Sequence, residues 1–292
     1  MSAPAHPVAG FFGGQRVVAA FGRALQALHR VAPRLGARAA LRLFFTPLPS
    51  KRVARRVPVP AGWSLARWPF EGDDIAVYRR DDLPADRPVV LFVHGWAGHG
   101  LQMRALADAV ADAGGAPVLI DLPGHGRSSG WHATLPQFVR GLWAASARLG
   151  PLHGLVAHSM GALAAAHAVA HGLPVGRLAL LATSPPPKLV LKWFTGGFGL
   201  GTPVGMRMRQ LIEAREGIDF DHFEADALAG RLPAATLVVH DADDRAAPAD
   251  LARRLADGVA GARWLGTRGL GHRRVLADAA VVREVAEHVT RP

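Results

Sequence analysis

The chain of 292 residues is long enough to bury a large core, and its composition, half hydrophobic and a fifth charged, indicates a folded globular protein. It contains no cysteine, which excludes disulfides, thiolate metal sites and a cysteine nucleophile. The formal net charge of +11 comes almost wholly from arginine, and it indicates either an acidic partner or membrane surface, or charges dispersed over the protein.

Several classes of protein do not fit this sequence. No apolar stretch approaches the ~20 residues that are needed to span a bilayer. Residues 1–14 lack the basic and apolar regions of a secretory signal, so we expect a cytoplasmic protein. The basic residues are not interleaved with stacking aromatics, and nucleic acid is therefore not an expected partner.

Residues 1–50 are expected to form a flexible segment followed by a basic helical arm. Residues 1–13 are rich in Ala, Pro and Gly, whereas apolar residues recur at helical spacing over residues 15–29 and again over 35–45. Such an arm either lies on an anionic membrane surface through residues 14–45, peripheral to its inner face, or packs its apolar stripe on its own protein.

Residues 51–292 are expected to form one α/β domain. Its predicted strands are residues 53–59, 64–69, 75–80, 89–93, 117–120, 154–157, 178–182, 236–240 and 262–265. Its predicted helices are residues 100–114, 135–149, 163–171, 248–258 and 274–289, with His288 at the surface of the last. The alternation after residue 88 predicts a mostly parallel, doubly wound sheet, whose ligands bind at the carboxyl ends of the strands.

Residues 184–232 interrupt this alternation. The segment begins with three prolines, contains several glycines and is too long for a plain connection. We interpret it as a small cap inserted over the carboxyl edge of the sheet. Aromatic residues of the cap and nearby loops are candidates for a substrate pocket: Trp96, Trp131, Trp193, Phe194 and Phe198.

Ser159 lies between an apolar strand and an Ala-rich helix, with Ala157 two positions before it and Gly161 two positions after. Small residues at these places allow a strand to reverse sharply into a helix and expose the serine hydroxyl, which is the pattern of a nucleophile elbow. The alternative is that Ser159 simply caps the helix.

A serine nucleophile requires a general base and a carboxylate that orients it. His272 follows the last predicted strand in a glycine-rich loop, and Asp241, Asp243 and Asp244 follow the strand before it. Any of these three aspartates could be the orienting acid.

A tetrahedral intermediate also needs amide donors for its oxyanion. The N–H of Met160 begins the helix after Ser159, and the N–H of Trp96 lies in the loop after the strand at residues 89–93. His94, His99, His125 and His158 lie near these loops without the spacing of a metal motif, so no metal or cofactor is expected.

Together these motifs resemble the α/β-hydrolase superfamily over about residues 56–292. The matching segments, in chain order, are His94-Gly95-Trp96, residues 121–130, Ala157-His158-Ser159-Met160-Gly161, residues 240–248 and Gly271-His272. The resemblance implies that Asp244 is the acid and Pro248 the proline of the acid loop. The chain departs from the family pattern at Ala157, Ala162 and Asp241, where the family commonly has glycine.

The resemblance implies a serine hydrolase of the carboxylesterase or lipase-like class that acts on a small-molecule ester or acyl substrate. Because the nucleophile is Ser159 and not Asp, the alkyl-enzyme route of the family's dehalogenases and epoxide hydrolases is not expected. Acyl transfer, thioester or amide hydrolysis with the same triad, and a membrane-associated scaffold without activity, are the alternatives. No residue pattern indicates an oligomeric state.

Overall fold

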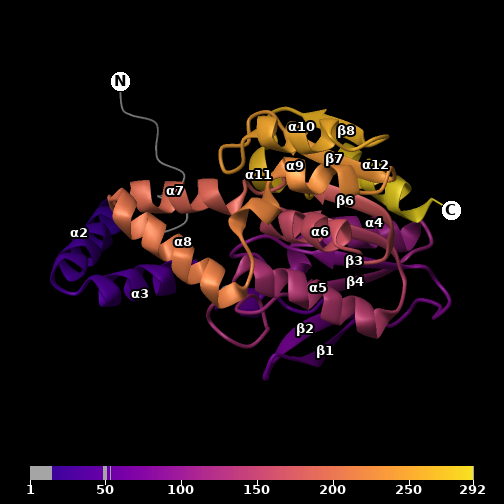
Figure 1. Ribbon diagram of the computed structural model, residues 1–292. Coiled ribbons are helices and arrows are strands. Elements are labelled where there is room, and N and C mark those ends of the chain that lie inside the picture. The colour runs from indigo at the N-terminus through magenta and orange to yellow at the C-terminus, as the bar shows by residue number, and fades with distance from the viewer. Residues whose placement is uncertain (1–14, 49–50, 53, 292) are drawn as a thin grey trace.

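The computed structural model describes residues 15–48, 51, 52 and 54–291 (Figure 1). The segment expected to be flexible, residues 1–13, lies outside the described residues. The sheet has the strand order β1-β2-β4-β3-β5-β6-β7-β8, in which β1 and β2 are antiparallel to their neighbours and the other strands are parallel. The expected mostly parallel sheet is confirmed. Its strands are β1 (Trp63–Phe70), β2 (Asp73–Arg80), β3 (Val89–Val93), β4 (Ala116–Asp121), β5 (Leu152–His158), β6 (Val175–Leu181), β7 (Thr236–Asp241) and β8 (Arg263–Thr267).

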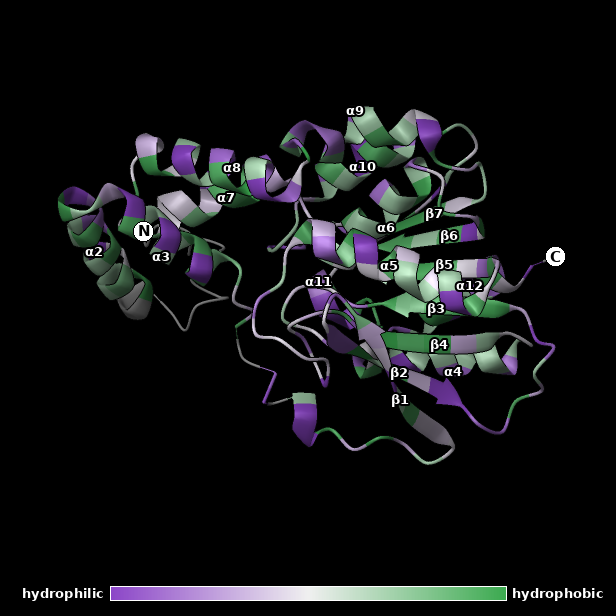
Figure 2. Cartoon of the chain, turned by 60° about the horizontal axis from the view of Figure 1, so that its bottom comes forward, coloured by the Kyte–Doolittle hydropathy of each residue, from purple (hydrophilic) through white to green (hydrophobic). Residues whose placement is uncertain are grey.

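Helices cover both faces of the sheet. Alternate side chains of β3 enter two different cores, with Val90 and Phe92 in one and Leu91 and Val93 in the other. Figure 2 shows the apolar character of the central strands that this double burial requires. One face carries α4 (Arg104–Asp112) and α12 (Ala279–Thr290), and the other carries α5 (Leu135–Leu149), α6 (Met160–Ala170) and α10 (Ala249–Asp257).

A third apolar cluster joins the N-terminal arm to the cap. We call α2 (Gln15–Val31) and α3 (Pro33–Phe44) the arm, and residues 184–232 the cap. Val18 and Leu25 of the arm share this cluster with Phe194 and Phe198 of the cap, and Figure 1 shows the four longest helices of the two segments together at one side of the sheet. The cap comprises α7 (Pro187–Gly197), α8 (Thr202–Glu216), η3 (Phe220–Phe223), α9 (Ala225–Leu228) and η4 (Ala229–Arg231). Three short elements complete the described part of the fold: η1 (Ala54–Arg56), η2 (Gly100–Met103) and α11 (Gly271–Arg274).

Some local predictions were wrong. The strand predicted over residues 53–59 is replaced by η1, and Pro58 and Pro60 explain this because proline donates no ladder hydrogen bond. The helix α7 was not predicted, although Pro187 at its first turn suits a helix start. His288 is buried and not at the surface. Its Nε2 donates to the carbonyl oxygens of Leu178 and Ala235, and these bonds offset the cost of burying the imidazole. None of the described helices is both long and apolar enough to cross a membrane.

Two buried histidines, both in the neutral form, hold the loops at the carboxyl edge of the sheet by hydrogen bonds. The Nε2 atom of His94 accepts from the N–H of Leu122 at 3.0 Å, and its Nδ1 donates to the Gly95 carbonyl at 2.7 Å. His158 donates through Nε2 to the His272 carbonyl at 2.9 Å. Burial lowers the pKa of His94 to about 4 and that of His158 to about 3.

Because of these two histidines, the protein should begin to lose stability at a pH well above the pKa values of its carboxylates. In the unfolded chain each takes up a proton near pH 6.5, whereas the folded protein resists protonation, so stability is full above this pH and falls as the pH drops towards 4. Each of the two histidines should lower the free energy of unfolding by about 2 kcal/mol when the pH falls from 7 to 5. Urea unfolding of the wild type and His94→Gln measures this fall, which the variant should reduce. Equal wild-type stability at both pH values would contradict the prediction.

Candidate active site

Ser159 lies at the sharp junction between β5 and α6. Its backbone has φ 54° and ψ −121°, a conformation that a non-glycine residue adopts only when its surroundings enforce it. Two hydrogen bonds do so: the Ser159 N–H donates to the Leu181 carbonyl at 2.9 Å, and the Ser184 N–H donates to the Ser159 carbonyl at 3.1 Å. The Ser159 side chain makes no capping hydrogen bond to α6, so the helix-cap alternative is wrong.

Two glycines allow other backbone segments to approach this junction. A Cβ atom at Gly161 would lie 2.3 Å from the His94 carbonyl oxygen, and one at Gly95 would lie 2.6 Å from the Ser159 Cβ. Both separations are shorter than non-bonded atoms permit, so only glycine fits either place. The elbow and the loop after β3 are therefore packed directly against each other.

Three side chains from three strand ends form a continuous hydrogen-bonded chain. The Ser159 Oγ lies 2.9 Å from His272 Nε2, and His272 Nδ1 lies 2.7 Å from Asp244 Oδ2. A carboxylate only accepts, so Nδ1 carries the proton and Nε2 is free to accept from the serine hydroxyl. The sequence placed these residues after β5, β7 and β8, and the parallel sheet brings those three ends to one edge.

The surroundings of Asp244 keep it ionised. Its second oxygen accepts from the N–H groups of Ala246 and Ala247 at 2.8 and 3.0 Å. Burial acts to raise the pKa of the Asp244 carboxyl, but the hydrogen bonds from His240 and His272 outweigh burial and hold this pKa well below its usual value. The carboxylate thus faces His272 as a fixed negative charge.

The two other candidate aspartates hold the loop that carries His272. Asp241 accepts from the Thr267 hydroxyl at 2.8 Å and from the Leu270 N–H at 2.9 Å. Asp243 accepts from the Gly269 N–H at 2.9 Å. Neither makes a hydrogen bond to the His272 ring, so Asp244 is the carboxylate that contacts the imidazole.

The two amides predicted to bind an oxyanion belong to the segments that meet at Ser159. Met160 is the first residue of α6, so its N–H has no acceptor within the helix and lies at the positive end of the dipole. Trp96 directly follows Gly95, which touches Ser159. Trp96 and Met160 both border the same cavity as Ser159.

The loop at residues 121–130 is held by the buried carboxylate of Asp121. It accepts from the Gly100 N–H at 2.6 Å, from the Tyr78 hydroxyl at 2.7 Å and from the Arg127 N–H at 2.7 Å. These bonds link the loop to β2 and to η2, which follows the Trp96 loop. This motif therefore positions the site and contributes no side chain to the chain of hydrogen bonds at Ser159.

A cavity of about 180 Å³ opens above Ser159 and His272. The body supplies Trp96, Leu135 and Leu163, the cap supplies Val190, Trp193, Phe194, Ile212, Ile218, Phe220 and Phe223, and the arm and the residue after it supply Phe44 and Phe45. The walls are thus largely apolar. Phe44 and Phe45 were not predicted here, because no pattern in the sequence indicates that the end of α3 reaches the elbow.

Two of the five predicted pocket residues do not line this cavity. Trp131 is half exposed, and the Lys51 ammonium lies 4.6 Å from the centre of its ring. Phe198 is buried between cap and arm, where its ring packs 4.7 Å from that of Phe194. Trp96, Trp193 and Phe194 do border the cavity. The two exceptions are corrections to the predicted pocket.

Comparison with known proteins agrees with this architecture. A family model described as alpha/beta hydrolase fold matches residues 88–200. No curated protein matches the sequence. The solved structures that match include Est1E from Butyrivibrio proteoclasticus with ferulic acid bound, at 19% identity and a TM-score of 0.59, covering 77% of this chain and 96% of that one.

Two further solved structures show how widely the fold is shared. A loop variant of a haloalkane dehalogenase from Bradyrhizobium elkanii matches at 19% identity and a TM-score of 0.56, covering 78% of this chain and 97% of that one. A bacterial membrane phospholipase A matches at 15% identity and a TM-score of 0.60, covering 92% of this chain and 97% of that one. Such identities show a common fold. The chain has the α/β-hydrolase fold, and its residues 88–200 match that family's model.

Proposed function

We propose that this protein is a serine hydrolase that cleaves carboxylic esters with an apolar acyl group. The observation that carries the proposal is the chain of hydrogen bonds from Ser159 through His272 to Asp244, at 2.9 and 2.7 Å, at the floor of an apolar cavity. A hydroxyl, an imidazole and a buried carboxylate in this order are the parts that nucleophilic acyl transfer requires.

In the proposed reaction, Ser159 Oγ attacks the ester carbonyl carbon while its proton passes to His272 Nε2. The amides of Met160 and Trp96 donate to the resulting oxyanion, and Asp244 stabilises the imidazolium. The C–O bond to the alcohol then breaks as His272 returns the proton to the leaving oxygen. Water, deprotonated by His272, attacks the acyl-serine and releases the acid, which restores the hydroxyl of Ser159.

Replacement of the reacting side chains tests the proposal. Ser159→Ala should lower kcat for p-nitrophenyl ester hydrolysis at least about 10⁴-fold, because the nucleophile is lost. Asp244→Asn should lower it by about 10²- to 10⁴-fold, because an amide fixes the wrong tautomer of His272 and cannot stabilise its charge. Asp243→Asn is the matched control and should stay within about tenfold, since Asp243 contacts the Gly269 N–H and the Arg268 guanidinium and makes no hydrogen bond to the His272 ring.

Initial rates on acyl-CoA and on aminoacyl anilides, beside the p-nitrophenyl esters, identify the scissile bond. The proposal requires the ester to be the best of the three substrates. It is contradicted by ester turnover that survives in Ser159→Ala, or by equal losses in Asp243→Asn and Asp244→Asn.

The largely apolar cavity wall supports the proposal that the acyl group is an apolar chain. Val190 on α7 borders the cavity, so a larger residue there should shorten the space above Ser159. Val190→Phe should lower kcat/KM for p-nitrophenyl decanoate relative to butyrate at least about fivefold, since each displaced methylene is worth ~1 kcal/mol or more. Trp131→Ala is the control, because Trp131 lies outside the wall. An unchanged ratio in Val190→Phe would contradict this placement of the acyl chain.

We further propose that the arm holds the enzyme on an anionic lipid surface. On the apolar face of α2, Val18 and Leu25 pack onto the cap, whereas Phe21 and Leu28 lie along the adjacent edge of that face and are 52% and 37% exposed. Val31, at the end of α2, is 87% exposed. Residues 15–48 contain six arginines and no acidic residue. Exposed apolar side chains among cations match the headgroup boundary of an anionic membrane, and Phe44 and Phe45 connect this arm to the cavity.

Vesicle binding tests the role of the arm. Wild-type protein should co-sediment with vesicles of equal phosphatidylglycerol and phosphatidylcholine, and 0.5 M salt should weaken this binding by screening. The double variant Phe21→Ser/Leu28→Ser should bind at least about tenfold less tightly, because two apolar side chains no longer insert.

The matched control for the vesicle experiment is Leu65→Ser/Trp143→Ser, which removes two apolar side chains of similar exposure from β1 and α5. This control should bind as the wild type does. Equal binding by the arm variant and the wild type, or no preference for the anionic vesicles, would contradict the proposal.

A further inference from the structure

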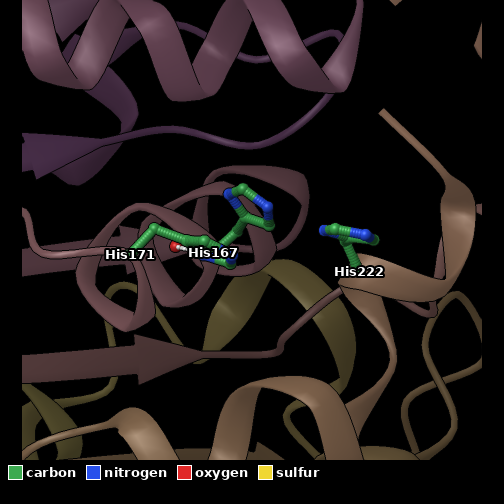
Figure 3. A group of neighbouring side chains, drawn as sticks. All are labelled: His167, His171 and His222. Carbon is green, nitrogen blue, oxygen red and sulfur yellow. Dashed lines mark hydrogen bonds between the residues drawn. The ribbon is translucent and has the colours of Figure 1, made fainter. Parts of the chain in front are cut away.

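Three histidines gather on the side of α6 that faces the cap, away from Ser159. His167 lies on α6, and His171 directly follows the last residue of this helix, four positions further on, so the two side chains lie on the same side. His222 comes from η3 (Figure 3). One ring nitrogen from each residue lies within 4.8 Å of the nitrogens of the other two. The cluster thus joins the helix of the elbow to η3 of the cap.

The hydrogen bonding of His167 distinguishes this cluster from an ordinary stack of rings. Its side chain is 6% exposed, and neither ring nitrogen has a hydrogen-bond partner among the described residues. A buried nitrogen without a partner loses its hydration with no compensation, at a cost that proteins rarely accept. A ligand that accepts the lone pair of the unprotonated ring nitrogen would remove the part of this penalty that falls on that nitrogen.

His171 is already held in a form suited to such a ligand. Its Nδ1 lies 2.8 Å from the His167 carbonyl oxygen, and since a carbonyl only accepts, Nδ1 carries the proton. The lone pair of His171 is therefore on Nε2. A backbone carbonyl that fixes one ring nitrogen, and leaves the other to an ion, is the usual support of a metal-bound histidine.

We propose that His167, His171 and His222 bind a divalent transition metal ion of the zinc class, which fastens the cap to α6. Three neutral imidazoles suit such an ion, and water completes a tetrahedral shell. Ligand nitrogens around zinc lie about 3.4 Å apart, so His171 and His222, both exposed, move inward by about 1 Å. No step of the reaction proposed at Ser159 passes through this ion.

The position of His222 gives the ion a consequence for the cavity. Phe220 and Phe223 belong to the same short helix as His222 and border the cavity above Ser159. The ring of Phe223 also stacks on that of His167, with their centres 4.4 Å apart. An ion that holds η3 against α6 therefore fixes two aromatic residues of the cavity wall.

Zinc titration of the full chain tests this site. After removal of metals with a chelator and dialysis, calorimetric titration with ZnCl₂ should show one ion per chain. His171→Ala and His222→Ala should each weaken binding at least about tenfold. Both residues are exposed, so the variants should fold, which circular dichroism checks. His132→Ala is the matched control with an exposed histidine elsewhere and should bind zinc as the wild type does.

A second readout tests the fastening of the cap, and a third separates this site from Ser159. Zinc should slow proteolytic cleavage at residues 217–224 in the wild type but not in His222→Ala. Ser159→Ala should bind zinc unchanged, whatever its effect on catalysis. Wild-type protein that binds no zinc, or binding by His171→Ala and His222→Ala as tight as that of the wild type, would overturn the site. Binding without protection from proteolysis would overturn the fastening of the cap.

Discussion

The backbone of Ser159 is held at a positive φ of 54° by hydrogen bonds to Leu181 and from Ser184, both at the end of β6 or just beyond it. This strain costs of order 1–3 kcal/mol, and it persists because the register of β5 and β6 in the middle of the sheet fixes the Leu181 carbonyl beside Ser159. The same conformation turns the hydroxyl away from α6 and towards His272. The strained serine therefore depends on a sheet that is buried on both faces.

Different carboxylates at the edge of the sheet fix different parts of this geometry. Asp244 contacts the imidazole, Asp241 and Asp243 hold the loop that carries it, and Asp121 connects the loops after β3 and β4. His158 adds a bond to the carbonyl of His272 from the strand next to Ser159. Loops that bear reactive side chains are in this way fixed by buried polar partners and not by apolar packing alone.

The sequence predicted the sheet well because strands such as β3 are continuous apolar runs, and residues such as Pro88 and Gly95 mark where they end. It also placed Ser159, Asp244 and His272 after strands whose carboxyl ends must meet. The residues that line the cavity were less predictable. Phe44 and Phe45 line it and Trp131 does not, and only the tertiary packing decides which of these aromatic residues reach it. His222 shares no sequence neighbourhood with His167, so only the folded cap reveals their proximity. The sequence left α2 with two possible roles, membrane binding or packing on its own protein. The buried part and the exposed edge of its apolar face allow both.

The reactivity of Ser159 is tested most directly by a fluorophosphonate probe, which phosphonylates a serine only when an adjacent base activates it. Folded wild-type protein should acquire one adduct, which mass spectrometry of the peptides should locate on Ser159. Ser159→Ala should acquire none, and Asp244→Asn should react more slowly than the wild type. Folded wild-type protein that remains unlabelled, or an adduct that persists in Ser159→Ala, would contradict an activated serine and favour a scaffold without activity.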